Sequence, residues 1–183
     1  MTSERATLRL EPAVHTHDIL DGPVRRHPKS HFLDFHVDGV SLLTTAHEQA
    51  NRVTDLNRTW ATEAVSQAVE ALLGRHASPD LEGGRVPLLV CGSCGDLTCG
   101  AVTAKLDVRT NEVRWSEFRW ENGYEDPEPI KLLFAPITFD RVQYEAELTD
   151  AAQRVAALPE SERFLERPRR ERHRRWPWLR RAD

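Results

Sequence analysis

The 183-residue sequence has three cysteines and no long apolar run, and both shortages narrow the class of protein. No apolar run approaches the roughly 20 residues that span a bilayer, and residues 1–20 lack the apolar core of a signal peptide. The cysteines are odd in number and lie within the single segment 91–99, which argues against a secreted disulfide framework. These absences predict a cytoplasmic protein with no transmembrane segment.

Motifs for nucleotide cofactors and common hydrolases are also absent. The chain has no G-x-G-x-x-G after a predicted strand, no P-loop, no G-x-S-x-G elbow and no H-E-x-x-H pair. The sequence therefore carries no nucleotide-cofactor signature and identifies no catalytic residue for these enzyme classes. With 39% apolar and 30% charged residues, the composition is that of an ordinary globular domain.

The net charge of −4 is distributed unevenly along the chain. Residues 167–183 contain eight arginines against two acids, so this segment carries +6 and the remainder carries −10. We therefore predict one α+β domain over residues 1–160 and an Arg- and Trp-rich basic tail over 161–183. Within the tail, residues 167–181 suit phosphate contacts and base stacking, but the acidic body opposes nucleic acid at long range. The alternative is a tail that docks on its own acidic domain.

Strand and helix signals alternate without regular βαβ order. Residues 31–43 alternate apolar and polar around Asp38 and Gly39, which is typical of a hairpin with a type I′ turn. Helical spacing predicts one helix over 59–73 and another over 140–158. We therefore expect an α+β fold: an antiparallel β-sheet built from hairpins, with two main helices packed on one face.

Shorter apolar segments predict further strands at 7–11, 87–91, 100–108 and 113–120. The first is expected to end near Pro12, with a loop over residues 12–30. In the last, the apolar parity changes between Trp115 and Phe118, which predicts a β-bulge. Asp140 is the expected N-cap of the final helix.

The cysteine segment carries the clearest chemical signal. Cys91 and Cys94 have the C-x-x-C-G spacing of a zinc knuckle, in which two thiolates converge on one ion and the glycine frees backbone N–H groups toward sulfur. Cys99, separated from Cys94 by four residues, can supply a third thiolate. A tetrahedral zinc site then needs a fourth ligand, either water or a histidine, and we take His76 as the predicted one. The other histidines considered are His15, His17, His31 and His36.

Two other interpretations of the cysteines stay open. Cysteine often packs as a small buried hydrophobe, and neighbouring glycines suit tight strand connections. The C-x-x-C spacing also matches thiol redox centres. However, Gly95, Thr98 and Gly100 are poor residues for the helix that such centres use.

Three segments together resemble an uncharacterised family of small bacterial proteins. They are residues 26–39 (RHPKSHFLDFHVDG), 89–103 (LVCGSCGDLTCGAVT) and 139–144 (FDRVQY), of which the second holds the motif CxxCGDxxCGAVT. The resemblance covers most of residues 5–150 and leaves out the Arg-rich tail. Some members carry an automatic oxidoreductase label, but the family has no established activity, so the resemblance implies a shared fold and no catalytic residue.

The segment 117–128 is acidic and contains Trp120 and Tyr124. Such a surface can imitate phosphates and bind a basic protein, as immunity and inhibitor proteins do, or it can be a solvated loop beside the sheet. Three functions follow from the sequence. The first is a soluble non-enzymatic module with a structural zinc site that acts through a partner surface. The alternatives are an immunity- or inhibitor-type protein without metal and a thiol-dependent redox enzyme.

Overall fold

The structure is a computed structural model that describes residues 5–21, 24–26, 28–46, 51–78, 80–122, 124–130 and 136–161. The strands are β1 (Leu8–Thr16), β2 (Ile19–Asp21), β3 (Val24–Arg26), β4 (Lys29–Val37), β5 (Val40–Ser41), β6 (Arg52–Val53), β7 (Arg85–Cys91), β8 (Ala101–Val108), β9 (Glu112–Glu121), β10 (Glu128–Pro129) and β11 (Ile137–Asp140). The helices are α1 (Leu42–Thr45), α2 (Thr62–Leu72), the 3₁₀ helix η1 (Leu97–Cys99), α3 (Arg141–Thr149) and α4 (Ala151–Ala157).

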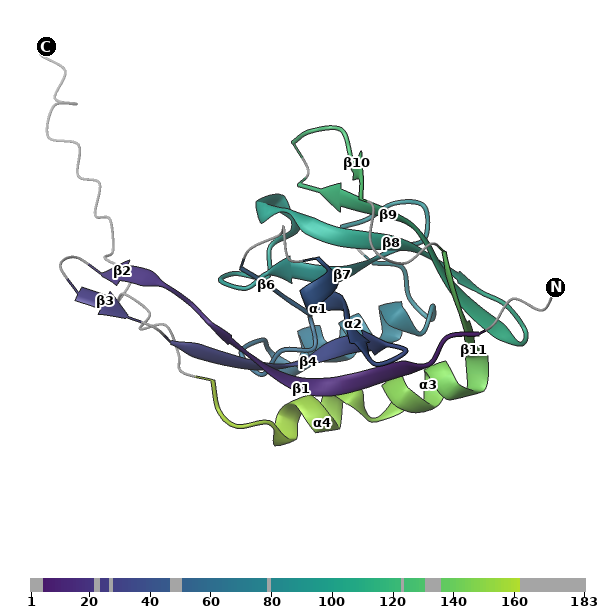
Figure 1. The fold of residues 1–183 in the computed structure, drawn as a ribbon, viewed down its shortest axis with the longest axis horizontal. Helices are drawn as coiled ribbons and strands as arrows, with labels where there is room; N and C mark the ends of the chain where they lie inside the picture. The colour runs from purple at the N-terminus through teal and green to yellow at the C-terminus, as the bar shows by residue number, and fades with distance from the viewer. Residues whose placement is uncertain are drawn as a thin grey trace, which may run out of the picture.

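The strands form antiparallel sheets, and helices pack against them, so the predicted α+β fold is confirmed (Figure 1). One sheet has the order β1-β4-β5, and the other has the order β10-β9-β8-β7-β6 with β11 beside β9. Helix α3 packs against β1 and β9, while α2 contacts α3 and α4. The short strands β2 and β3 form a separate two-stranded ribbon.

A cluster of aromatic side chains joins the two sheets. Trp115 of β9 is fully buried and meets Phe35 of β4 and Phe139 of β11 edge to face, with ring centroids 5.5 and 5.0 Å away. Its indole N–H donates to the Tyr144 hydroxyl at 3.1 Å, and that hydroxyl donates to the Leu72 carbonyl at 3.0 Å. Strands of both sheets and the helices α2 and α3 therefore share one core, in which the polar atoms of Trp115 and Tyr144 are hydrogen-bonded.

Several local predictions are confirmed. Asp38 and Gly39 have φ angles of 51° and 79°, the two positive values that a type I′ turn requires. The Asp140 carboxylate accepts a hydrogen bond from the Gln143 amide at 3.1 Å and caps α3. The expected bulge lies in β9, where Glu117 has a φ of 49° and the register with β8 shifts.

Three expectations are wrong. Pro12 lies inside β1, opposite Leu33, because β1 is an edge strand and can tolerate a residue without an amide proton. Much of segment 12–30 is strand rather than loop, since β1 continues to Thr16 and the β2–β3 ribbon follows. The final helix is interrupted at Asp150, whose φ of −105° and ψ of 8° lie outside the helical region.

Side chains from the final helices hydrogen-bond the outer edge of β1. The amide of Leu8 donates to the Gln143 side chain at 3.1 Å, and that of Leu10 donates to the Glu147 carboxylate at 2.8 Å. The Gln143 amide group and the Arg154 guanidinium return hydrogen bonds to the carbonyls of Leu8 and Leu10. At Leu8 and Leu10, the backbone groups that the edge strand leaves unpaired are therefore satisfied within the chain.

The predicted basic tail falls almost entirely on residues 162–183, which lie outside the described residues. In the part of the chain that the structure describes, no helix combines the length and the apolar composition needed to cross a bilayer.

Candidate metal centre

The cysteines lie on the connection between β7 and β8. Cys91 is the last residue of β7, Cys94 lies in the following turn, and Cys99 ends η1. The turn is closed by the Gly95 amide, which donates to the Cys91 carbonyl at 2.8 Å, and Gly95 has a φ of 72° that favours glycine. The Asp96 carboxylate caps η1 by accepting from the Thr98 amide at 2.8 Å. Hydrogen bonds within the connection therefore fix both its turn and η1.

Gly100 turns the chain from Cys99 into β8. Its φ is 91°, and a Cβ at this position would lie only 2.0 Å from Cζ2 of Trp120. Both the backbone conformation and the close indole ring therefore require glycine here. The absence of a side chain lets Trp120 pack directly over the backbone that carries Cys99.

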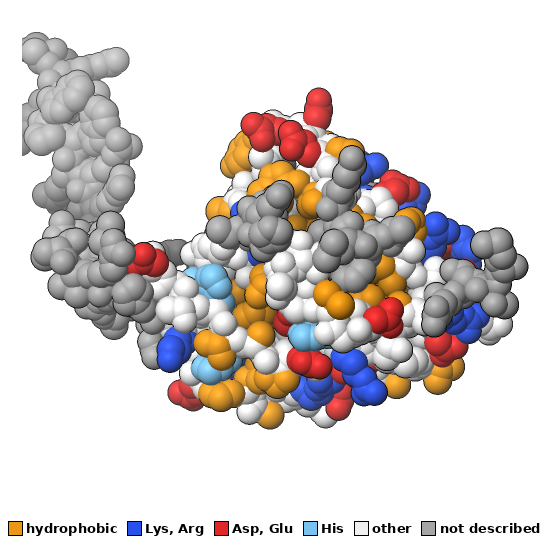
Figure 2. All heavy atoms as spheres, viewed as in Figure 1, with side chains coloured by type: hydrophobic (Ala, Val, Ile, Leu, Met, Phe, Trp, Pro, Cys, Tyr) orange, Lys and Arg blue, Asp and Glu red, His pale blue; other side chains and the backbone are white. Residues whose placement is uncertain are grey.

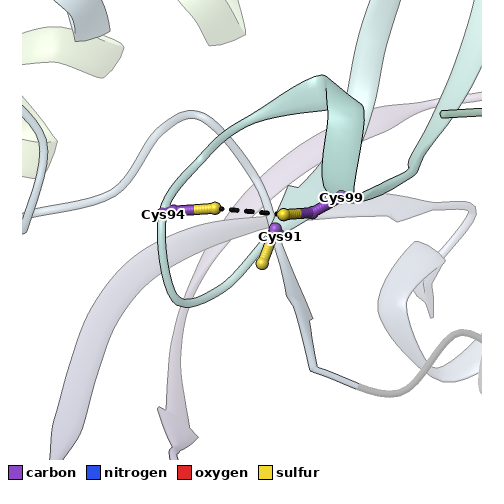
Figure 3. Close-up of side chains that lie close together, drawn as sticks. All are labelled: Cys91, Cys94 and Cys99. Carbon is purple, nitrogen blue, oxygen red and sulfur yellow. Dashed lines mark hydrogen bonds between the residues drawn. The ribbon is translucent and has the colours of Figure 1, made fainter. Parts of the chain in front are cut away.

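The three sulfur atoms converge, as Figure 3 shows. All three Sγ atoms lie within 4.8 Å of one another, and those of Cys94 and Cys99 are 3.5 Å apart. Sulfur ligands of a tetrahedral zinc ion lie about 3.8 Å apart, given Zn–S bonds of about 2.3 Å. Cys91 is only 7% exposed, whereas Cys94 and Cys99 are exposed. The donor set therefore fits a thiophilic metal ion reached from the solvent side.

The surroundings shift the thiol pKa values in opposite directions. Burial alone would raise the pKa of Cys91, but backbone hydrogen bonds from Ser93 and Cys94, a hydrogen bond from the Cys94 thiol and the charge of Arg52 together lower it. Burial raises the pKa of Cys94 to about 11, and its interactions with the other two thiols add to the rise. Cys91 therefore ionises before Cys94, and a bound cation would stabilise a second thiolate beside the first.

Arg52 of β6 supports the connection between β7 and β8 that carries the cysteines, called the cysteine loop below. It pairs with Cys91 in the β6–β7 ladder, and its guanidinium donates to the Cys99 carbonyl at 2.9 Å. The same guanidinium lies 4.7 Å from the centre of the Trp120 ring, which is a cation–π contact. One residue therefore holds both ends of the cysteine segment, Cys91 through its backbone and Cys99 through its side chain, and supplies positive charge.

Asn51 joins the loop to two of the candidate histidines. Its side chain donates to the Ser93 hydroxyl at 3.1 Å and bonds the His15 ring at 2.9 Å. The rings of His15 and His17 lie edge to face, with centroids 4.5 Å apart. Cε1 of His17 is 3.2 Å from the position of a Cβ on Gly92. These histidines are neighbours of the loop, but their nitrogen atoms are not part of the converging donor group.

The predicted fourth ligand, His76, does not join the sulfur atoms. It follows α2 and lines a pocket with Gly84 and Val108, to which none of the three cysteines contributes. His36 lies near Glu11 and Asp34, at 3.6 Å from each carboxylate. Among the residues that the structure describes, the donor group consists of the three cysteines alone. A fourth position remains available to water or to another ligand.

Ion pairs with basic residues offset part of the negative charge of the acidic segment 117–128. Glu117 pairs with Lys105 and Arg119 at 3.2 and 3.1 Å, and Glu121 pairs with Arg85 at 2.6 Å. The remaining acids, Glu125, Asp126 and Glu128, are exposed on the β9–β10 connection and at the start of β10. Figure 2 shows acidic side chains gathered at this tip of the molecule, at the top of the view. A protein partner for this tip stays a prediction.

Asn51 and Arg52 carry no sequence signal that assigns them to this site, because their segment has no clear helical or strand periodicity. No protein-family model matches the chain, and neither curated proteins nor solved structures give a match. The site is therefore interpreted from its own chemistry.

Proposed function

We propose that the protein is a non-enzymatic α+β module whose Cys91, Cys94 and Cys99 thiolates bind one thiophilic metal ion, with Zn²⁺ as the first candidate. The observation that carries the proposal is the convergence of the three sulfur atoms within 4.8 Å. Cysteine thiolates prefer such ions over hard cations. The fourth position is filled by water or by a group from a partner surface, which is the proposed means by which the module acts.

The metal would supply cross-linking of the cysteine segment. The large apolar core of the domain lies around Trp115 and includes none of the three cysteines. We therefore expect metal removal to loosen the connection between β7 and β8 without unfolding the domain. This differs from a zinc finger, in which metal binding supplies most of the folding free energy.

The first experiment measures metal content by plasma emission in untagged protein purified without chelator. We expect about one zinc per chain and protection of the thiols until the metal is removed. Replacing zinc by cobalt should produce the thiolate-to-cobalt charge-transfer absorption. Each of Cys91→Ser, Cys94→Ser and Cys99→Ser should weaken binding strongly, whereas Ser93→Ala in the same turn should retain it. Absence of metal, together with failure to bind added zinc or cobalt, would refute the proposal.

The distance between Cys94 and Cys99 favours a second candidate, a thiol redox function. Both thiols are exposed, and their sulfur atoms are 3.5 Å apart. A peroxide would take two electrons from the pair, giving one disulfide and two molecules of water. The free-thiol count after peroxide treatment would fall by two in the wild type and remain higher in Cys94→Ser. A metal-free protein whose thiols react in this way would favour redox chemistry over metal binding.

A further inference from the structure

A second feature lies next to the cysteine loop and is not used by the proposed metal centre. It is a pocket of about 180 Å³ between α2, β4 and the loop, to which Gly95 contributes. Its apolar lining consists mainly of Phe35, Leu56, Ala64, Ala68, Leu72 and Leu97. A cavity of about 150 Å³ in another protein holds benzene. The pocket therefore has room for an apolar group the size of one ring.

Two carboxylic acids line this apolar pocket. Asp55 follows β6, and Asp80 lies in the connection between α2 and β7. Within the described part of the chain, Asp55 accepts no hydrogen bond and forms no ion pair. Burial, together with the negative charge of Asp80, raises the pKa of Asp55 to about 7. The fold therefore keeps a carboxyl group at a place where nothing in the described chain stabilises its ionised form.

A buried hydroxyl group is available at the same place. Ser78 also lines the pocket and is only 8% exposed, yet its hydroxyl makes no hydrogen bond to the described residues. Gln67 of α2 adds an amide group to the lining. The Asp55 carboxyl group and the Ser78 hydroxyl both line the pocket and have no hydrogen-bond partner among the described residues. Both are therefore available to a polar ligand that enters the pocket.

The lining points to an organic cation rather than to a metal ion. No third histidine, cysteine or acid joins Asp55 and Asp80 as a metal-ligand group among the described residues. Magnesium and calcium require several oxygen ligands and keep bound water, which the apolar wall formed by α2 does not favour. A positively charged nitrogen needs fewer partners and can carry an apolar group that occupies the rest of the pocket.

We propose that this pocket binds a small primary amine bearing an apolar group about the size of one ring, with its ammonium group at Asp55 and Asp80. The apolar part lies against α2, and the Ser78 hydroxyl accepts from the ammonium group. The proposal does not depend on the metal centre.

The test uses benzylamine and the neutral benzyl alcohol, added to the full chain at mildly alkaline pH and followed by titration calorimetry and amide NMR shifts. Benzylamine should bind at one site and shift residues of α2 and the cysteine loop, at least tenfold more tightly than benzyl alcohol. Asp55→Asn should weaken benzylamine about tenfold to a hundredfold, as expected for loss of a charged hydrogen bond. Asp126→Asn, which removes an exposed acid that is not part of the lining, should leave the affinity unchanged.

Two further measurements test the proposal even if Asp55→Asn does not fold. Asp80→Asn changes an exposed residue and should weaken benzylamine about threefold while leaving benzyl alcohol unaffected. Magnesium or calcium chloride should not compete with benzylamine beyond the effect of ionic strength. Equal affinities for amine and alcohol, shifts that map elsewhere, or competition by the divalent ions would each overturn the proposal. Titrating both metal-loaded and metal-free protein separates this result from the outcome at the cysteines.

Discussion

Replacing Gly100 by alanine tests whether the close approach of Trp120 shapes the cysteine segment. The new Cβ would lie 2.0 Å from one ring carbon of Trp120 and 2.4 Å from another. The backbone φ of 91° is unfavourable for any residue with a side chain. The substitution therefore combines a conformational cost with a clash against a rigid ring.

The two costs can be estimated separately. Gly100 combines a φ of 91° with a ψ of 139°, an extended conformation nearly restricted to glycine, in which a residue with a side chain costs about 1–3 kcal/mol. Overpacking against a side chain that cannot move freely adds about 1–3 kcal/mol. We therefore expect Gly100→Ala to lower the free energy of unfolding by about 2–6 kcal/mol. It should also weaken metal binding, because the displaced Trp120 ring no longer holds Arg52 against the Cys99 carbonyl.

Gly83 provides a control that has a positive φ angle but no clash. Its φ is 68°, and no atom lies within 4 Å of a Cβ placed there. Chemical denaturation of both variants should therefore show a cost of only about 1–2 kcal/mol for Gly83→Ala. In a Trp120→Leu background, the cost of Gly100→Ala should fall toward that of the control. Equal costs for the two alanine variants would refute the argument that the indole ring determines this position.

Three further predictions concern stability. Asp55 holds its proton in the folded state up to about pH 7 but has an ordinary pKa of 3.8 when unfolded. The contribution of the protonated carboxyl group to the free energy of unfolding is therefore fully present below about pH 4 and is lost as the pH rises to about 7. Asp55→Asn should stabilise the protein at about pH 8 by at most about 4 kcal/mol and flatten the pH dependence of denaturation. Tyr144→Phe should cost about 1–2 kcal/mol in denaturant, because the Leu72 carbonyl and the Trp115 indole lose their hydrogen-bond partner. Asp140→Ala should lower the thermal midpoint through loss of about 1 kcal/mol of helix capping, whereas Asp140→Asn should retain most of it.

The parts of the fold that the sequence predicts well are those decided by neighbouring residues. The Asp38–Gly39 turn and the Asp140 cap depend on contacts within three or four positions, so local chemistry is sufficient. Pro12 misled the strand prediction because its effect depends on whether its strand lies at an edge, which only the sheet order decides. The break at Asp150 has no local signal as strong as a proline or glycine.

In the candidate site too, the sequence predicts what neighbouring residues decide and misses what long-range contacts decide. The spacing of Cys91, Cys94 and Cys99 correctly predicted that these thiols can converge, because all three lie on one short connection. The choice of His76 as fourth ligand rested on residue type alone, and its place after α2 depends on the packing of the whole domain. Arg52 reaches the loop only through the pairing of β6 with β7, a long-range contact that periodicity cannot reveal.

The hydrogen bonds along the outer edge of β1 have a consequence for self-association. An unpaired edge strand is a template on which a strand from another molecule can add, and repeated addition leads to aggregates. At Leu8 and Leu10, the amides and carbonyls that would accept such a strand are already bonded to Gln143, Glu147 and Arg154. An incoming strand would have to displace these side chains before it could pair at Leu8 and Leu10. The final helices thus protect the first half of this edge against strand addition.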